Sequence, residues 1–108
     1  MPSLLIMVIG ACTIELYLHD PDTLKDKRSV LKGLLARLRK EFTISAAEVG
    51  LHDAHHAATI GCAIVSTSAA HAQNLLDHVV AWIETNRPDL DVVDHHIEII
   101  HFSSASGE

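Results

Sequence analysis

The sequence has few aromatic residues, few cysteines and no long apolar run. Aromatic residues make up 4% of its 108 residues, so few rings are available to stack on nucleic-acid bases. The two cysteines, Cys12 and Cys62, lie in apolar stretches, where we expect buried reduced thiols rather than a disulfide. The apolar runs fall short of the roughly 20 residues that a membrane-spanning helix needs. The formal net charge of −6 argues against a protein that binds polyanions over its whole surface.

The overall composition is that of a globular domain. Hydrophobic residues make up 48% and charged residues 20% of the chain, which excludes wholesale disorder and a disulfide-dense miniature scaffold. A chain of 108 residues can bury a core of its own but is short for two domains. We therefore expect one cytoplasmic domain over residues 1–102, no cofactor, and a flexible tail over residues 103–108.

The apolar start of the chain favours a strand over a secretion or lipidation signal. Residues 4–11 precede Cys12, but no Lys or Arg comes before them. Alternation of apolar and polar residues then continues to Leu18, which is typical of a half-buried strand.

Hydrophobic periodicity and turn signals predict four strands and two helices. Thr23 and Asp26 have the spacing of a capping box at the first helix. Ser68 is a suitable cap for the second helix, which Arg87 and Pro88 end. The order β-α-β-β-α-β is typical of the α+β ferredoxin-like sandwich, a split βαβ fold with two helices on one face of an antiparallel sheet of order 4-1-3-2. The expected strands are residues 4–18, 43–49, 57–66 and 92–102, and the first helix is residues 24–41.

One face of this sheet has no helix to cover it. Leu5, Met7 and Ile9 of the first strand would point to that face, because side chains alternate along a strand. An apolar patch on an open sheet face usually marks an association surface, so we expect a homodimer. The residues of this strand expected to face the helices are Ile6, Val8, Cys12, Ile14 and Leu16.

Positive charge is concentrated in the first helix. Seven of the eight Lys and Arg residues lie within residues 25–40, which carry a net charge of +6 and leave −12 on the rest of the chain. Four of them fall within about 60° of one another on a helical wheel and form a basic ridge about 21 Å long. The basic ridge consists of Lys25, Arg28, Lys32 and Arg39.

The first turn of this helix carries three cations, Lys25, Lys27 and Arg28. The helix macrodipole disfavours cations at this end by about 0.3–1 kcal/mol each. Their placement therefore favours an anion site at the start of the helix, although a solvated helix face is the simpler alternative. Lys27 also lies near the apolar stripe, so its ammonium must reach solvent or find a partner.

Three segments resemble a bacterial family of unknown function. They are residues 23–32 (TLKDKRSVLK), residues 47–49 (AEV) with Asp53, and residues 58–61 (ATIG). On these motifs the chain resembles the YlxP-like family over about residues 6–100. The resemblance implies a ferredoxin-like fold and no known activity, and genes of this family tend to lie beside those for translation-initiation and ribosome-binding factors. After Asp53 the family often has an aromatic residue and then polar or basic residues, where this chain has Ala54, His55, His56 and Ala57.

A histidine-rich segment lies between the second and third expected strands. Imidazole and carboxylate groups so close together are suitable ligands for zinc or nickel. The spacing matches no fixed metal-binding framework, so adventitious binding and a plain polar loop are alternatives. The candidate metal ligands are His52, Asp53, His55 and His56, to which His95, His96 and Glu98 of the last strand could add.

The open sheet face also carries polar side chains. Alternation places Thr13, Glu15 and Tyr17 near His96 and Glu98 of the neighbouring strand. A carboxylate pair with His and Tyr could support acid-base chemistry, but a polar rim around a dimer interface explains the same residues. No nucleophile elbow or Gly-rich phosphate loop accompanies them, which makes an enzyme the less favoured interpretation.

These observations favour a small non-enzymatic binding module that associates with RNA or a ribosomal particle through its first helix. The alternatives are a metal-binding or metal-dependent protein that uses the segment 52–56, and a structural homodimerisation domain. We expect no membrane partner. The candidate anion-binding residues are Lys25, Lys27, Arg28, Lys32 and Arg39.

Overall fold

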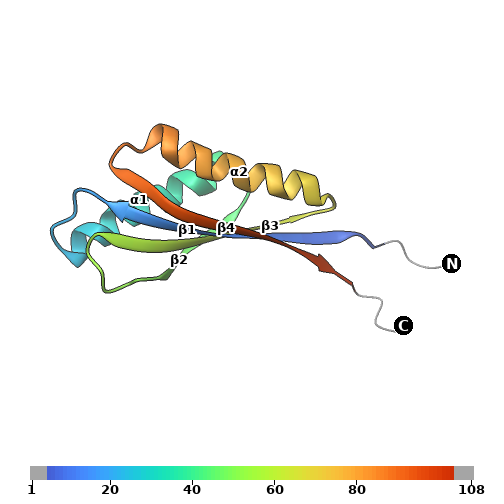
Figure 1. Cartoon of the computed structure of the whole chain (residues 1–108), viewed down its shortest axis with the longest axis horizontal. Helices are drawn as coiled ribbons and strands as arrows, with labels where there is room; N and C mark the ends of the chain where they lie inside the picture. The colour runs from blue at the N-terminus through green and yellow to red at the C-terminus, as the bar shows by residue number, and fades with distance from the viewer. Residues whose placement is uncertain (1–4, 104–108) are drawn as a thin grey trace.

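The computed structural model describes residues 5–103 and contains the six elements expected from the sequence, in the expected order (Figure 1). The expected strand start at Leu4 and the expected tail beyond Ser103 lie outside the described residues. The elements are β1 (Met7–Leu18), α1 (Leu24–Glu41), β2 (Ser45–Gly50), β3 (Ala57–Ser66), α2 (Ala69–Asn86) and β4 (Leu90–Phe102).

The four strands form one antiparallel sheet of order β2-β3-β1-β4, which confirms the expected topology. Both helices lie on the same side of this sheet, so the fold is an α+β ferredoxin-like sandwich (Figure 1). The side of the sheet away from the helices is called the open face below. None of the helices within residues 5–103 is long and apolar enough to cross a membrane.

The hydrophobic core lies between the sheet and the two helices. In β1 the side chains of Val8, Cys12, Ile14 and Leu16 are buried, as the alternation predicts. Ile6 is the exception, because it precedes the first paired residue of β1 and is 64% exposed. The expectation that Ile6 faces the helices was therefore wrong.

Both helices begin at the predicted caps. The Thr23 hydroxyl accepts a hydrogen bond from the Asp26 backbone N–H at 3.0 Å, and the Ser68 hydroxyl accepts one from the His71 N–H at 3.1 Å. Each cap satisfies one of the backbone donors left free at a helix start. Gly10 of β1 lets α2 approach closely, because a Cβ there would lie 3.0 Å from the Leu76 Cδ1 atom.

Three strands start at positions that differ from the prediction, and β1 starts at Met7 rather than at Leu4. β2 starts at Ser45 rather than Thr43, because the Ile44 N–H bonds back to the Phe42 carbonyl in a tight turn after α1. β4 starts at Leu90 rather than Val92, directly after a turn in which the Leu90 N–H donates to the Arg87 carbonyl.

Candidate nucleic-acid interface

The basic ridge lies on the solvent side of α1. Lys25, Arg28 and Lys32 are exposed, and none of them forms an ion pair within residues 5–103. Their spacing of three, four and seven residues places them on one strip of the helix surface. Three unpaired cations on one strip give this part of an acidic protein a local positive potential.

Arg39 joins the C-terminal end of the basic ridge to the sheet edge. Its guanidinium donates a hydrogen bond to the backbone carbonyl of Ala46 in β2. β2 pairs only with β3 within the described chain, so it is an edge strand. The basic ridge therefore runs along the side of α1 that borders the β2 edge.

Lys27 does not share the position of the other candidate anion-binding residues. Its side chain is 1% exposed, and its ammonium donates to the Leu51 carbonyl at 2.6 Å. The Glu48 carboxylate of β2 lies 3.3 Å from the Lys27 Nζ atom. Burial keeps Lys27 out of the basic ridge, and its ammonium instead connects α1 to β2 and to the turn that follows.

The other two cations of α1 lie outside the basic ridge. Arg37 pairs with Glu41 at 3.2 Å, and its guanidinium lies over the Trp82 ring, 5.5 Å from the ring centroid. Lys40 is exposed near the end of the helix. Arg37 is therefore already engaged by an acid and a ring on the α2 side.

The turn after β2 contains the histidine-rich segment. Leu51 has a positive φ of 61°, and its carbonyl accepts from both the Lys27 ammonium and the Ala54 N–H. That double acceptance explains how a non-glycine residue is held in the left-handed region. The buried lysine thus fixes the start of the loop.

The candidate metal ligands are not gathered into a site. His52, Asp53, His55 and His56 are all exposed. Within residues 5–103, no three His, Cys, Asp or Glu side chains are placed to hold a metal ion. The His56 Nδ1 atom lies 2.8 Å from the Leu18 carbonyl, so one of its two ring nitrogens is already occupied.

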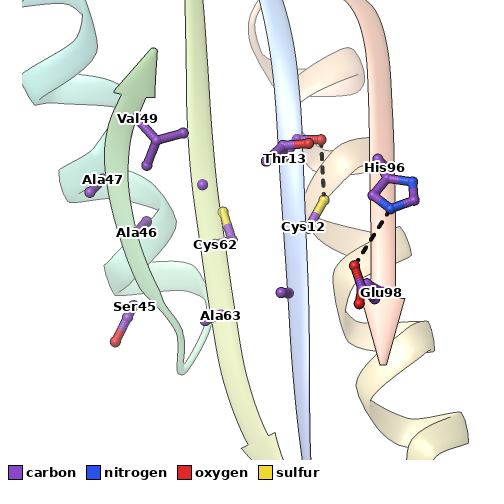
Figure 2. Close-up of a pocket in the computed structure, with 12 residues that line it drawn as sticks. Cys12, Thr13, Ser45, Ala46, Ala47, Val49, Cys62, Ala63, His96 and Glu98 are labelled. Atoms are coloured by element: carbon purple, nitrogen blue, oxygen red, sulfur yellow. Dashed lines mark hydrogen bonds and ion pairs between the residues drawn. The ribbon is translucent and has the colours of Figure 1, made fainter. Parts of the chain in front are cut away.

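The open face has a hollow at its centre (Figure 2). Its volume is about 500 Å³, and small side chains of β1, β2 and β3 form its floor. A Cβ on Gly61 would lie 3.0 Å from a Val49 methyl group, so Val49 leans over the position that glycine leaves open. The floor of this central hollow consists of Ala11, Ala47, Gly61 and Ala63. Val49, His96 and Glu98 lie at its margins.

The polar residues of the open face are spread along the strands. Thr13 pairs with His96, as expected, and His96 lies 3.9 Å from Glu98. Tyr17 pairs instead with Asp91, and its ring stacks on His56 with centroids 5.9 Å apart. The candidate acid-base residues therefore do not converge on one point.

The two cysteines face each other across β1 and β3 in the core. Cys12 and Cys62 are directly opposite in the strand register, and both are buried with free thiols, as expected. Burial raises the pKa of the Cys12 thiol to about 11 and that of Cys62 to about 12. Neither thiol is a suitable nucleophile near neutral pH, because the thiolate is the reactive form.

The sequence missed two features of these surfaces. Glu48 is separated from Lys27 by 21 positions, and nothing in the local pattern identifies it as the partner of a buried ammonium. The central hollow left a clearer signal, because small residues recur at open-face positions of three strands. Counting side-chain size at alternate strand positions would have located it.

The fold and the surface together define a small α+β domain with a basic helix strip and an open, partly apolar sheet face. Residues 9–97 match the family model described as protein of unknown function (DUF503). The chain is also 35% identical to the uncharacterized protein YlxP of Bacillus subtilis (strain 168) over 78 residues, which cover 72% of this chain and 85% of that protein. This chain belongs to the DUF503 family, in agreement with the resemblance seen in its motifs.

Proposed function

We propose that this chain is a small non-enzymatic module that binds RNA, in isolation or within a ribosomal particle, through the basic ridge of α1. The supporting observation is that Lys25, Arg28 and Lys32 are exposed on one strip without an acid partner within residues 5–103. In a protein of net charge −6, unpaired cations gathered on one helix favour an anionic ligand.

Distance decides whether local attraction exceeds the repulsion from the whole protein. At physiological salt the Debye length is about 8 Å, so a phosphate on α1 feels the basic ridge far more than acids elsewhere. The strands contain no Lys or Arg, and their acids lie on the sheet, including the far edge strand β4. RNA would therefore approach α1 and not the open face.

Few aromatic rings are available to recognise bases. Phe42 is half-buried against the core, and Trp82 lies under Arg37. Specificity would then come from the shape and phosphate spacing of a folded RNA, with the ridge of about 21 Å as the matching element.

The experiment compares two double variants that remove the same charge from the same helix. Arg28→Ala/Lys32→Ala removes two cations of the basic ridge, and Arg37→Ala/Lys40→Ala removes two cations outside it. Fluorescence anisotropy with structured ribosomal RNA fragments should show at least a tenfold weaker affinity for the first variant and a smaller loss for the second. Equal losses, or no binding by the wild type at low salt, would reject the ridge as the RNA site.

We also propose that the chain forms a homodimer through the open face. Val65, Ile100 and Phe102 are large apolar residues left exposed there. Apolar side chains grouped on an uncovered sheet face favour association. Sedimentation velocity over micromolar concentrations tests this proposal, because a monomer at every concentration would contradict it.

A further inference from the structure

Beside the central hollow, the open face carries a group of apolar side chains that project from the sheet. Ile9 of β1 pairs with Val65 of β3 on one side and with Ile100 of β4 on the other, so the three side chains form a row across the sheet. Val65 is 70% exposed and Ile100 is 44% exposed. Together with Phe102 this row is called the apolar end. It lies about 13 Å along the strands from Gly61, four residues away in β3.

We propose that a second copy of this chain fills the central hollow, so that the apolar end of each copy seats in the hollow of the other. The proposal rests on the homodimer proposed above and names the surfaces that meet. A twofold pair needs a surface that complements itself, and a raised group and a hollow on the same face meet that need.

The strand register places the twofold axis. An axis lying between the two facing sheets, crossing the strands at Ala11 and Ala63, brings Val65 of one copy over Gly61 of the second copy. The same axis brings Ile9 over the second copy's Thr13. Val65 then meets Gly61 and the Val49 side chain that leans over it, and Ile100 meets His96 of the second copy. Ala63 meets its own counterpart at the axis.

The contact is large enough for a specific dimer of modest affinity. Strands about 4.8 Å apart and about 3.3 Å per residue give an overlap of about 19 by 26 Å, or about 500 Å² per copy. Two copies together reach about 1,000 Å², the size at which specific interfaces begin. A dissociation constant in the micromolar range is expected for such an interface.

Charges on the open face lie at the ends and at the axis of this contact. Glu15 and Asp94 pair with each other four residues from Ala11, so the same axis places them at the end of the overlap, opposite Met7 and Phe102 of the second copy. Glu98 pairs with Ala11 and therefore lies nearest the axis, where it would approach its counterpart. Like charges at the axis weaken the dimer, so Glu98→Gln should strengthen association.

The first experiment places a charge in the hollow. Ala63→Glu projects from the open face and disturbs no core contact, so circular dichroism should remain unchanged. Sedimentation should show at least a tenfold larger dissociation constant than for the wild type. Ala81→Glu, on the exposed side of α2, is the matched control and should dimerise as the wild type does.

The second experiment uses single-cysteine positions and a short bis-maleimide cross-linker at neutral pH. Ala63→Cys should cross-link to itself, because it lies on the axis. Val65→Cys alone should not, but a mixture of Val65→Cys and Ala47→Cys copies should. The wild type should not react, because its own thiols are buried, and Ala81→Cys should not cross-link.

These results separate the two proposals. A monomer at all concentrations would overturn both the homodimer and the seating of the apolar end. A dimer that cross-links Val65→Cys to itself, or that tolerates Ala63→Glu, would overturn the seating alone. Cross-links at Ala63→Cys and in the mixture, with stronger association of Glu98→Gln, would establish the seating.

Discussion

Lys27 of α1 and Glu48 of β2 meet 3.3 Å apart at the junction between a helix and an edge strand. The lysine side chain is 1% exposed and that of the glutamate 19%, so the ammonium is the more deeply buried partner. The same ammonium bonds to the Leu51 carbonyl. One buried cation thus couples the first turn of α1 to the loop that carries the histidine-rich segment.

Unequal burial predicts unequal costs for removing each partner. Glu48→Ala leaves a buried ammonium with one backbone acceptor and should destabilise the fold by about 2–4 kcal/mol. Lys27→Met leaves a carboxylate that can turn toward solvent and fills the space with an apolar chain, so its cost should be smaller. Urea denaturation of both variants checks the order, and a larger loss for Lys27→Met would contradict it.

The buried thiols predict a loss of stability in alkali. Their pKa values are about 11 and 12 in the folded protein, above the ordinary value of 9.0. The unfolded chain therefore loses these protons first as the pH rises above about 9, which favours unfolding progressively until the folded thiols also ionise. Below about pH 9 the thiols are protonated in both the folded and the unfolded chain, so the stability that the buried neutral thiols contribute is fully present.

The measurement is the free energy of unfolding from pH 8 to 11 for the wild type and for Cys12→Ala/Cys62→Ala. The variant has a smaller core and a lower stability throughout, but its decline with pH should be shallower. Parallel declines in the two proteins would show that the cysteines do not cause the alkaline loss.

Local sequence patterns predicted the fold more completely than they predicted the surfaces. Periodicity placed α1 and β3 at their observed limits, because apolar spacing and caps are local properties. The bulge in β4 between the partners of Glu15 and Leu16 was not predictable, since an extra residue is accommodated by pairing with another strand. Local sequence determines which elements form, and tertiary pairing determines their register.

In the basic ridge, too, some features follow from local sequence and others only from tertiary packing. A helical wheel placed Lys25, Arg28 and Lys32 on one strip, and the structure has all three exposed. The wheel also placed Lys27 near the apolar stripe, but its partner Glu48 is brought there only by the packing of α1 on β2. Helical position is therefore enough to predict which face a cation lies on, and not enough to predict whether it is free.

The turn before β4 predicts an acid-sensitive contribution to stability. Arg87 donates two hydrogen bonds to the Asp89 carboxylate, at 2.9 and 2.8 Å, and these bonds lower the pKa of Asp89. A carboxyl with a depressed pKa stabilises the fold above its unfolded pKa of about 3.9 and loses that effect as the pH falls through its folded pKa.

Asp89→Asn should therefore cost about 1 kcal/mol at pH 7 and much less near pH 2. Thermal unfolding of the wild type and the variant at both pH values measures the difference. A gap between them that stays constant with pH would contradict the role of this ion pair.

The histidine-rich segment predicts weak metal binding at most. His56 has one ring nitrogen at the Leu18 carbonyl, and no set of three ligands is gathered within residues 5–103. Protein purified without a metal column should hold well under one equivalent of zinc or nickel by plasma mass spectrometry. One tightly held equivalent that is lost in both His52→Ala and His55→Ala would favour the metal-binding alternative instead.

Salt dependence is the most direct test of how many phosphates the basic ridge contacts. Lys25, Arg28 and Lys32 are free to contact about three phosphates, whereas Arg39 already bonds to Ala46. With a single-stranded RNA as the probe, each neutralised phosphate contributes about −0.7 to the slope of log affinity against log salt, so the wild type should give about −2.

Removing one ridge cation should make that slope shallower by about 0.7, which Lys32→Ala tests with little change to the helix. Lys40→Ala removes the same charge outside the ridge and should leave the slope close to that of the wild type. Anisotropy titrations with one RNA at several salt concentrations measure all three slopes. If Lys32→Ala and Lys40→Ala gave the same slope, the contact would be a diffuse attraction to α1 rather than docking of phosphates along the basic ridge.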